Sequence, residues 1–275
     1  MSTIRNFIKP LVPRALLDAR TERHFFRNKQ WWATHLGEFG SFDEANAHIS
    51  KRAKPTNYVL DHDRWLKNRE KLSSHDYPVA FWLDKLINHL GQESLVDFGG
   101  SVGVSYYAMK KYMILPENLS WIVCELREVV ERGLQISAQR GDTQLQFTSD
   151  LSVIHRAPIF MASGSLHYLE TPLYDLLAQR EGAPNYLILN KLPLSAVKSF
   201  VTIESAGNGL YPCRVQLESS FLAGIESLGY RLVDRWKCLE HNMQVALKPE
   251  LSFKNFDGFF FSRDNSLRSA VSGKP

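Results

Sequence analysis

The chain has 275 residues, of which 44% are hydrophobic and 23% charged, a composition that is typical of a globular protein and excludes a mainly disordered one. No apolar run reaches the ~18 residues that span a bilayer, and residues 1–10 lack a secretory apolar core, so we expect a cytoplasmic protein. The net charge of +4 resides in residues 1–35, which carry seven Lys or Arg against Asp18 and Glu22; the nearly neutral remainder argues against nucleic-acid binding.

The first twenty residues interleave apolar and basic side chains. The basic residues are Arg5, Lys9 and Arg14, and the apolar ones are Ile4, Phe7, Ile8, Leu11, Val12, Leu16 and Leu17. This pattern is typical of an interfacial helix, here in peripheral contact with the cytoplasmic surface of the inner membrane, although Pro10 and Pro13 interrupt it. An arm that packs its apolar face on the domain explains the pattern equally well.

Residues 1–75 are predicted to form an N-terminal helical extension. Ser41 to Glu44 is a capping box for a helix that runs to about Arg52, and His62 to Leu72 has the pattern of a second surface helix. We expect the main domain to occupy residues 76–264 and a flexible tail to follow at 265–275.

The main domain shows the alternation of strands and helices that predicts a parallel sheet. It begins with a helix between Pro78 and Gly91 whose apolar residues all lie on one face. The strands expected after it are Ser94 to Phe98, Trp121 to Glu125, Leu145 to Thr148, Pro158 to Ala162, Tyr186 to Asn190, Tyr230 to Trp236 and Phe256 to Phe261. The helices expected between them are Val104 to Met113, Arg127 to Arg140, Pro172 to Arg180 and Ser219 to Leu228. No helical pattern separates the last two strands, which indicates an antiparallel addition. The predicted fold is therefore α/β, a Rossmann-like seven-stranded mostly parallel sheet with an antiparallel last strand and helices on both faces.

The stretch from Leu95 to Gly103 joins the first strand of this domain to a helix. Its glycines permit a tight turn and let a ligand approach the main chain, where N–H groups at the helix start are free to bind it. Acidic residues stand at the ends of the first three strands, namely Asp97, Glu125 and Asp150. Glu125 is placed to accept both hydroxyls of a ribose and Asp150 to accept an adenine amino group, although Asp150 serves equally well in a solvated loop. So many carboxylates disfavour a phosphate ligand and favour a cationic nucleoside.

These residues resemble the first motif of class I S-adenosylmethionine-dependent methyltransferases, which has the form acid-x-Gly-x-Gly-x-Gly. Asp97, Gly99 and Gly103 match it, whereas Ser101 stands where the middle glycine is usual and Gly100 is glycine one position earlier. The resemblance implies S-adenosyl-L-methionine as cofactor, bound by Asp97, Gly99, Gly100, Ser101, Gly103, Glu125, Leu126, Asp150 and Ser163.

A narrower resemblance covers nearly the whole chain. The segments that carry it are Gly40 to Ala45, Val96 to Ser101, Ala162 to Leu169, Gly229-Tyr230 and Asp257-Gly258. They are similar to a methyltransferase family found among bacterial surface-polysaccharide genes. This resemblance implies O-methylation of a saccharide or a lipid-linked glycan intermediate.

His167 and Tyr168 follow the fourth strand, on the edge where an acceptor would meet the methyl group. Since a sugar hydroxyl must lose its proton to attack, His167 is the candidate base, and His167 and Tyr168 are the predicted catalytic residues. A lone histidine is also often only packed. Amine methyltransferases commonly carry Asn/Asp-Pro-Pro-Tyr/Phe here, and residues 162–165 depart from it. His241 and Asn242 are expected to border the acceptor or to lie on the surface.

Two other interpretations stay open. One is a methyltransferase-like binding module without turnover, and the other is a nicotinamide-dependent oxidoreductase, although its Gly-x-Gly-x-x-Gly spacing is not met. The three cysteines form no Cys-x-x-Cys pair, and Cys238 with His241 supplies only two potential ligands, so no metal site is predicted.

Overall fold

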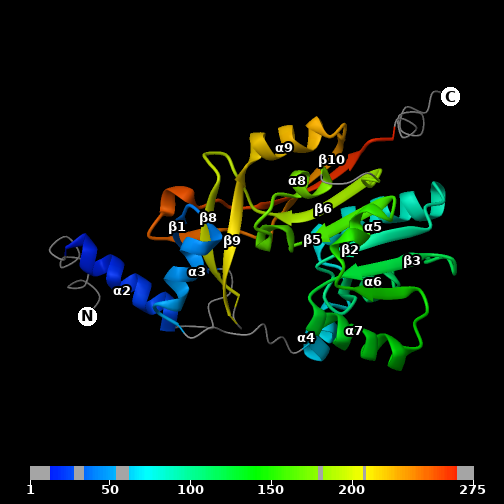
Figure 1. Ribbon diagram of the computed structural model, residues 1–275, viewed down its shortest axis with the longest axis horizontal. Helices are drawn as coiled ribbons and strands as arrows, with labels where there is room; N and C mark the ends of the chain where they lie inside the picture. The colour runs from blue at the N-terminus through cyan, green and yellow to red at the C-terminus, as the bar shows by residue number, and fades with distance from the viewer. Residues whose placement is uncertain (1–12, 28–33, 54–61, 179–181, 207–208, 265–275) are drawn as a thin grey trace.

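The structure is a computed structural model that describes residues 13–27, 34–53, 62–178, 182–206 and 209–264. Its larger sheet has seven strands (Figure 1). In spatial order they are β10 (Arg231–Cys238), β12 (Phe256–Ser262), β6 (Tyr186–Leu192), β5 (Ile159–Ser163), β2 (Ser94–Phe98), β3 (Ser120–Cys124) and β4 (Leu145–Thr148). The pairs β2–β3, β3–β4, β2–β5 and β5–β6 are parallel, whereas β12 runs antiparallel to both β6 and β10. The predicted Rossmann-like fold with an antiparallel last strand is confirmed.

Helices cover both faces of this sheet because successive strand residues point to opposite sides. On one face lie α5 (Tyr77–Asp84), which continues into a π-helical turn over Lys85–His89, α6 (Val104–Met109) and α7 (Arg127–Arg140). On the other lie α8 (Leu173–Ala178) and α9 (Glu218–Ser227). The expected bounds of α7 are confirmed, whereas α6 ends four residues earlier than expected and is followed by turns.

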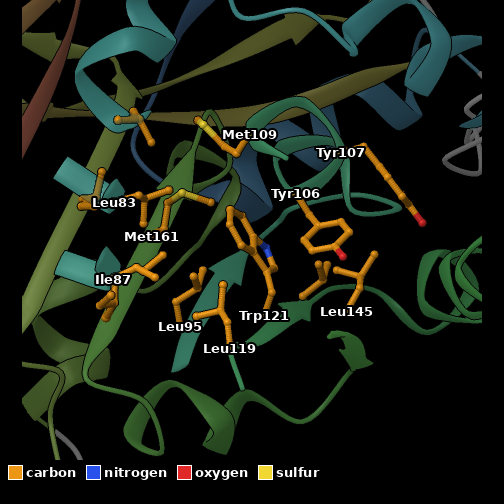
Figure 2. Close-up of a cluster of buried hydrophobic side chains, with 14 of the residues drawn as sticks. Leu83, Ile87, Leu95, Tyr106, Tyr107, Met109, Leu119, Trp121, Leu145 and Met161 are labelled. Atoms are coloured by element: carbon orange, nitrogen blue, oxygen red, sulfur yellow. The ribbon is translucent and has the colours of Figure 1, made fainter. Parts of the chain in front are cut away.

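Trp121 lies at the centre of the hydrophobic core between the sheet and the helices α5, α6 and α7. Figure 2 shows its indole between Leu95 and Tyr106, with Met161 and Leu83 beyond the leucine. The rings of Tyr106 and Trp121 meet edge to face at 5.6 Å. Each fully buried side chain of this size stabilises the fold by roughly 1.5–3 kcal/mol, so this core fixes the position of β2 and of the loop that follows it.

A second, five-stranded sheet lies beside the first and was not predicted from the sequence (Figure 1). Its strands, in spatial order, are β11 (Gln244–Ala246), β1 (Thr34–Phe39), β8 (Phe200–Ser205), β9 (Leu210–Leu217) and β7 (Leu194–Ser195). Strand β1 comes from the segment expected to be helical. In the sequence, β7 to β9 lie between β6 and α9, and β11 lies between β10 and β12. Residues before 76 therefore contribute a strand as well as helices to the structure.

The helices of that segment are α2 (Arg14–Arg27), α3 (Phe42–Ser50) and α4 (His62–Arg69). The capping box at α3 is present, with the Ser41 hydroxyl accepting the Glu44 N–H at 3.1 Å. One face of the second sheet packs on α2 and α3 through Phe25, Leu36, Phe42, Ala45, Ile49, Val201 and Ile203. The opposite face carries the alternate residues of β1 and β8, which include His35 and Glu204.

In the described part of the chain, no helix has the length and apolar character needed to cross a membrane. Most of the predicted interfacial segment, residues 1–12, lies outside the described residues. At the start of α2, Leu16 and Leu17 are exposed, whereas Phe25 near its end is buried.

Candidate active site

The order of the seven-stranded sheet reverses between β2 and β5. From β2 the chain adds β3 and β4 on one side, and from β5 it adds β6 on the other. In open α/β sheets, ligands bind outside the carboxyl ends of the strands at such a switch point. The segments that follow β2 and β5 therefore define the candidate site.

The glycine loop, residues Gly99–Gly103, follows β2. Neighbouring residues leave no room for a side chain at Gly99 or Gly103. Gly99 has a φ of +69°, and a Cβ there would lie 2.3 Å from the Cβ of Ser165. Gly103 has a φ of +87°, and a Cβ there would lie 2.8 Å from a methyl carbon of Leu145. The Gly100 carbonyl accepts the N–H groups of Gly103 and Val104 at 3.1 and 3.2 Å, which closes the turn into α6. The loop is thus held tightly against its neighbours.

Ser101 adopts the left-handed conformation, with a φ of +54°. A residue other than glycine is destabilised by about 1–2 kcal/mol in this conformation. Its N–H donates to the Glu125 carboxylate at 3.1 Å, and the other Glu125 oxygen accepts the Leu126 N–H at 2.8 Å. Burial raises the pKa of Glu125, and these two backbone hydrogen bonds oppose the rise. The structure therefore brings Ser101, Glu125 and Leu126 together at the ends of β2 and β3.

Asp97 is buried beneath the loop, in the last part of β2. The Trp121 indole N–H donates to one of its oxygens at 3.2 Å. Burial raises the pKa of Asp97 to about 7, the Trp121 hydrogen bond lowers it and the charge of Glu125 raises it further. A Cβ at Gly100 would lie 2.5 Å from the Asp97 carboxylate, so Asp97 lies directly against the loop.

Asp150 lies in an exposed turn after β4. Its two oxygens accept the backbone N–H and the hydroxyl of Ser152 at 2.9 and 2.5 Å, so it caps the 3-10 turn Leu151–His155. Arg156 lies 3.5 Å away at the surface. This geometry gives Asp150 a local structural role while leaving its carboxylate accessible beside the end of β3 and β4.

A hydrogen bond joins the segment after β5 to the end of β2, next to the glycine loop. The Ser165 hydroxyl donates to the Phe98 carbonyl at 2.7 Å, at the end of β2. His167 and Tyr168 follow in a 3-10 turn, Leu166–Tyr168. The Tyr168 hydroxyl donates to Glu204 at 2.8 Å, and His167 Nε2 lies 4.0 Å from the same carboxylate oxygen. The predicted catalytic pair therefore lies between the switch point and the second sheet.

His167 is almost fully buried, at 8% exposure. Burial lowers its pKa to about 4, the charge of Glu204 raises it and neighbouring His35 lowers it. The ring is consequently neutral near pH 7. Its Nδ1 has no hydrogen-bond partner among the described residues.

A polar cluster at the ends of β5 and β6 was missed in the sequence. Ser163, a predicted cofactor-binding residue, accepts the Asn190 amide at 3.2 Å, and the same amide donates to Asp76 at 3.2 Å. Lys191 lies 3.7 Å from Asp76 and has a left-handed φ of +59°. Burial lowers the pKa of Lys191, and Asp76 raises it. The sequence signal for this cluster was the polar pair Asn190 and Lys191 at the end of the predicted fifth strand.

His241 borders that cluster, and Asn242 beside it is exposed. Its ring lies 4.8 Å from His75, and it stacks on Phe256 at 5.7 Å. Burial lowers the pKa of His241 to about 4, with the charge of Lys191 acting in the same direction. His75 in turn contacts Glu240 at 3.0 Å. Two imidazoles and a lysine thus stand near the carboxyl ends of β5 and β6.

A surface hollow elsewhere does not belong to this site. It lies where α6 and α7 end, just before β4, and none of the residues that line it is a predicted site residue. Its lining residues are Tyr107, Lys110, Lys111, Arg140 and Asp142.

Comparison with known proteins gave similarity to solved structures only, since no family model and no curated protein matches the chain. The 1,6-didemethyltoxoflavin-N1-methyltransferase of Burkholderia thailandensis, bound to 1,6-didemethyltoxoflavin and S-adenosylhomocysteine, is 15% identical; the match covers 77% of this chain and 93% of that one, with a TM-score of 0.44. The N-terminal domain of EvdMO1 with bound S-adenosylhomocysteine is 17% identical over 90% of this chain and 98% of that one, with a TM-score of 0.47. The mitomycin 7-O-methyltransferase MmcR is 15% identical over 82% and 61%, with a TM-score of 0.44. At these identities and TM-scores the matches assign no activity, cofactor or acceptor to this chain.

Proposed function

We propose that the protein is an S-adenosylmethionine-dependent methyltransferase, with O-methylation of a saccharide or lipid-linked glycan intermediate as its reaction. The observation that carries the proposal is the glycine loop at the switch point, with Glu125 beside it. A glycine-rich turn at this point of an open α/β sheet is where nucleoside ligands bind close to the main chain. The acidic surroundings suit a sulfonium, which is cationic.

In this proposal the cofactor-binding residues are those named from the sequence. Glu125 receives the ribose hydroxyls through the lone pairs that its two backbone hydrogen bonds leave available. Asp150 and Leu126, exposed at the ends of β4 and β3, flank the adenine. Asp97 lies against the loop at Gly100.

The chain's own contribution to the chemistry is alignment of the acceptor and removal of its proton, because the sulfonium donor is already activated. We assign the proton to His167, which lies on the segment hydrogen-bonded to the end of β2. Tyr168 holds the neighbouring carboxylate. Lys191 and His241 border the acceptor from the β6 side.

The proposal of a glycan acceptor rests on the resemblance to the methyltransferase family found among bacterial surface-polysaccharide genes. Peripheral contact of residues 1–20 with the cytoplasmic membrane surface is part of the same proposal, because lipid-linked glycans are built there.

The experiment is incubation of the full chain with methyl-labelled donor and cell-envelope glycan precursors. We expect label in the saccharide fraction, with ether-type linkages that resist mild base. Label in a small-molecule fraction alone would contradict the glycan acceptor. Donor binding without any transfer to precursor or small-molecule pools would favour the non-catalytic binding module.

A further inference from the structure

The polar face of the second sheet gathers three potential metal ligands from distant parts of the sequence. His35 on β1 is paired directly with Glu204 on β8, and Cys213 on β9 is paired with Thr202, two residues from Glu204 on the same strand. Because side chains alternate along a strand, all three point to one face. Directly opposed residues have Cβ atoms about 4.5–5.5 Å apart, and diagonal neighbours are still within reach.

The donor atoms of these residues converge. One ligand atom of each of His35, Glu204 and Cys213 lies within 4.8 Å of the other two. The His35 Nε2 to Glu204 Oε2 distance is 4.0 Å. His35 and Cys213 are each 1% exposed, and the side chain of Glu204 is 15% exposed. Coordination of one ion at bond lengths of about 2.0–2.3 Å requires the three donors to move closer together than they lie in this structure.

We propose that His35, Glu204 and Cys213 bind a divalent transition-metal ion, Zn²⁺. One imidazole nitrogen, one carboxylate oxygen and one thiolate sulfur are the donor types that zinc takes. The mixture disfavours Mg²⁺ and Ca²⁺, which prefer oxygen ligands alone. Binding releases the Cys213 thiol proton to solvent, and no electron is transferred.

The surroundings of Glu204 suit a metal ligand. The Tyr168 hydroxyl donates to its Oε2 at 2.8 Å, the kind of hydrogen bond that orients a ligating carboxylate. Two imidazoles, His35 and His167, each place Nε2 4.0 Å from this same oxygen. A carboxylate largely removed from water gains from a cation. The metal supplies that cation.

Three protein donors leave one position of a tetrahedron for water or another oxygen ligand, as in catalytic zinc sites. His167 Nε2 lies 4.0 Å from Glu204 Oε2, the same distance as His35 Nε2, so His167 is a neighbour of the proposed carboxylate ligand. The site also joins β1 to β8 and β9. The metal thereby joins β1 to two strands that lie far from it in the sequence.

Metal content of the full chain, purified without a metal-binding tag and exposed to one equivalent of Zn²⁺ before gel filtration, tests the proposal. Elemental analysis should give about one zinc per chain for the wild type. Cys213→Ser and Glu204→Gln should bind zinc at least about tenfold more weakly. The matched control is Cys238→Ser, which removes another buried free thiol outside the cluster and should keep its zinc.

The Co²⁺-loaded wild type gives a second readout that does not depend on the variants folding. A thiolate-to-cobalt charge-transfer band is expected, because Cys213 supplies sulfur. A wild-type protein that retains no zinc, a cobalt spectrum without that band, or zinc retained equally by Cys213→Ser overturns the proposal. His167→Ala should keep its zinc, so loss of zinc from this variant would overturn the three-donor site. Donor binding is measured separately with S-adenosylhomocysteine, so failure of the metal site and failure of the proposed methyl transfer are distinguishable.

Discussion

Replacement of Asp97 by Asn should change how the stability of the ligand-free protein depends on pH. Burial raises the pKa of Asp97 from 3.8 to about 7 in the folded chain. As pH rises from about 4, the unfolded chain loses this proton while the folded chain keeps it, so the free energy of unfolding falls until the folded group also ionises near pH 7. One tenfold step in this equilibrium is worth about 1.4 kcal/mol, so the whole difference is on the order of 4 kcal/mol.

About 3 kcal/mol of this difference falls between pH 4.5 and 7.5. Urea unfolding of the wild type and of Asp97→Asn at these two pH values measures it, since the asparagine retains an acceptor for the Trp121 N–H but cannot ionise. The wild type should lose about 3 kcal/mol relative to the variant on going to pH 7.5. Glu240→Gln is the control, because the pKa of Glu240 is shifted in the opposite direction. Hydrogen bonds from Ser74 and His75 lower this pKa to about 2, so the contribution of Glu240 to the free energy of unfolding is lost only as pH falls below 4.5. A difference in stability between the wild type and Asp97→Asn that stays constant between the two pH values would refute the account of Asp97.

Three further predictions concern the site and the terminus. Gly103→Asp should abolish thermal stabilisation by S-adenosylhomocysteine, which for the wild type is ~2.7 kcal/mol at one hundred times the dissociation constant, whereas Gly141→Asp, at another glycine with positive φ but with open space around it, should keep it; equal stabilisation of both variants would contradict the assignment of the loop. His167→Ala should lower turnover by ~10² to 10⁴ with donor affinity nearly intact, and unchanged turnover would make His167 structural. Deletion of residues 1–20 should remove binding to anionic vesicles, which for the full chain should weaken as salt screens the basic residues over ~8 Å at physiological ionic strength; loss of donor binding or unfolding on deletion would instead identify a packed arm.

Local patterns in the sequence predicted most of the larger sheet. The Arg127–Arg140 helix has the predicted bounds because an apolar face and a terminal Gly141 mark it locally. The glycines after Asp97 predicted a tight turn, and the positive φ angles of Gly99 and Gly103 confirm it. Such features depend on neighbours in sequence, and a single chain reveals them.

The second sheet and its chemistry depend on contacts that no local pattern records. His35 pairs with Glu204 across a sequence separation of well over a hundred residues, and the short strand β1 contains a glycine that weakens its strand pattern. The group of His35, Glu204 and Cys213 has no ligand spacing that a sequence scan would detect. Similarly, the burial of Asp97 under Trp121 follows from packing rather than from its place in the motif. The division into residues 1–75, 76–264 and 265–275 stays a prediction.

The measurement that most directly tests the central claim is calorimetric titration of the full-length protein with S-adenosylhomocysteine and, in parallel, with NAD. The account predicts saturable binding of about one S-adenosylhomocysteine per chain, its loss in Gly103→Asp, and no binding of NAD. Binding of NAD without binding of S-adenosylhomocysteine would contradict the methyltransferase proposal and favour a nicotinamide-dependent enzyme.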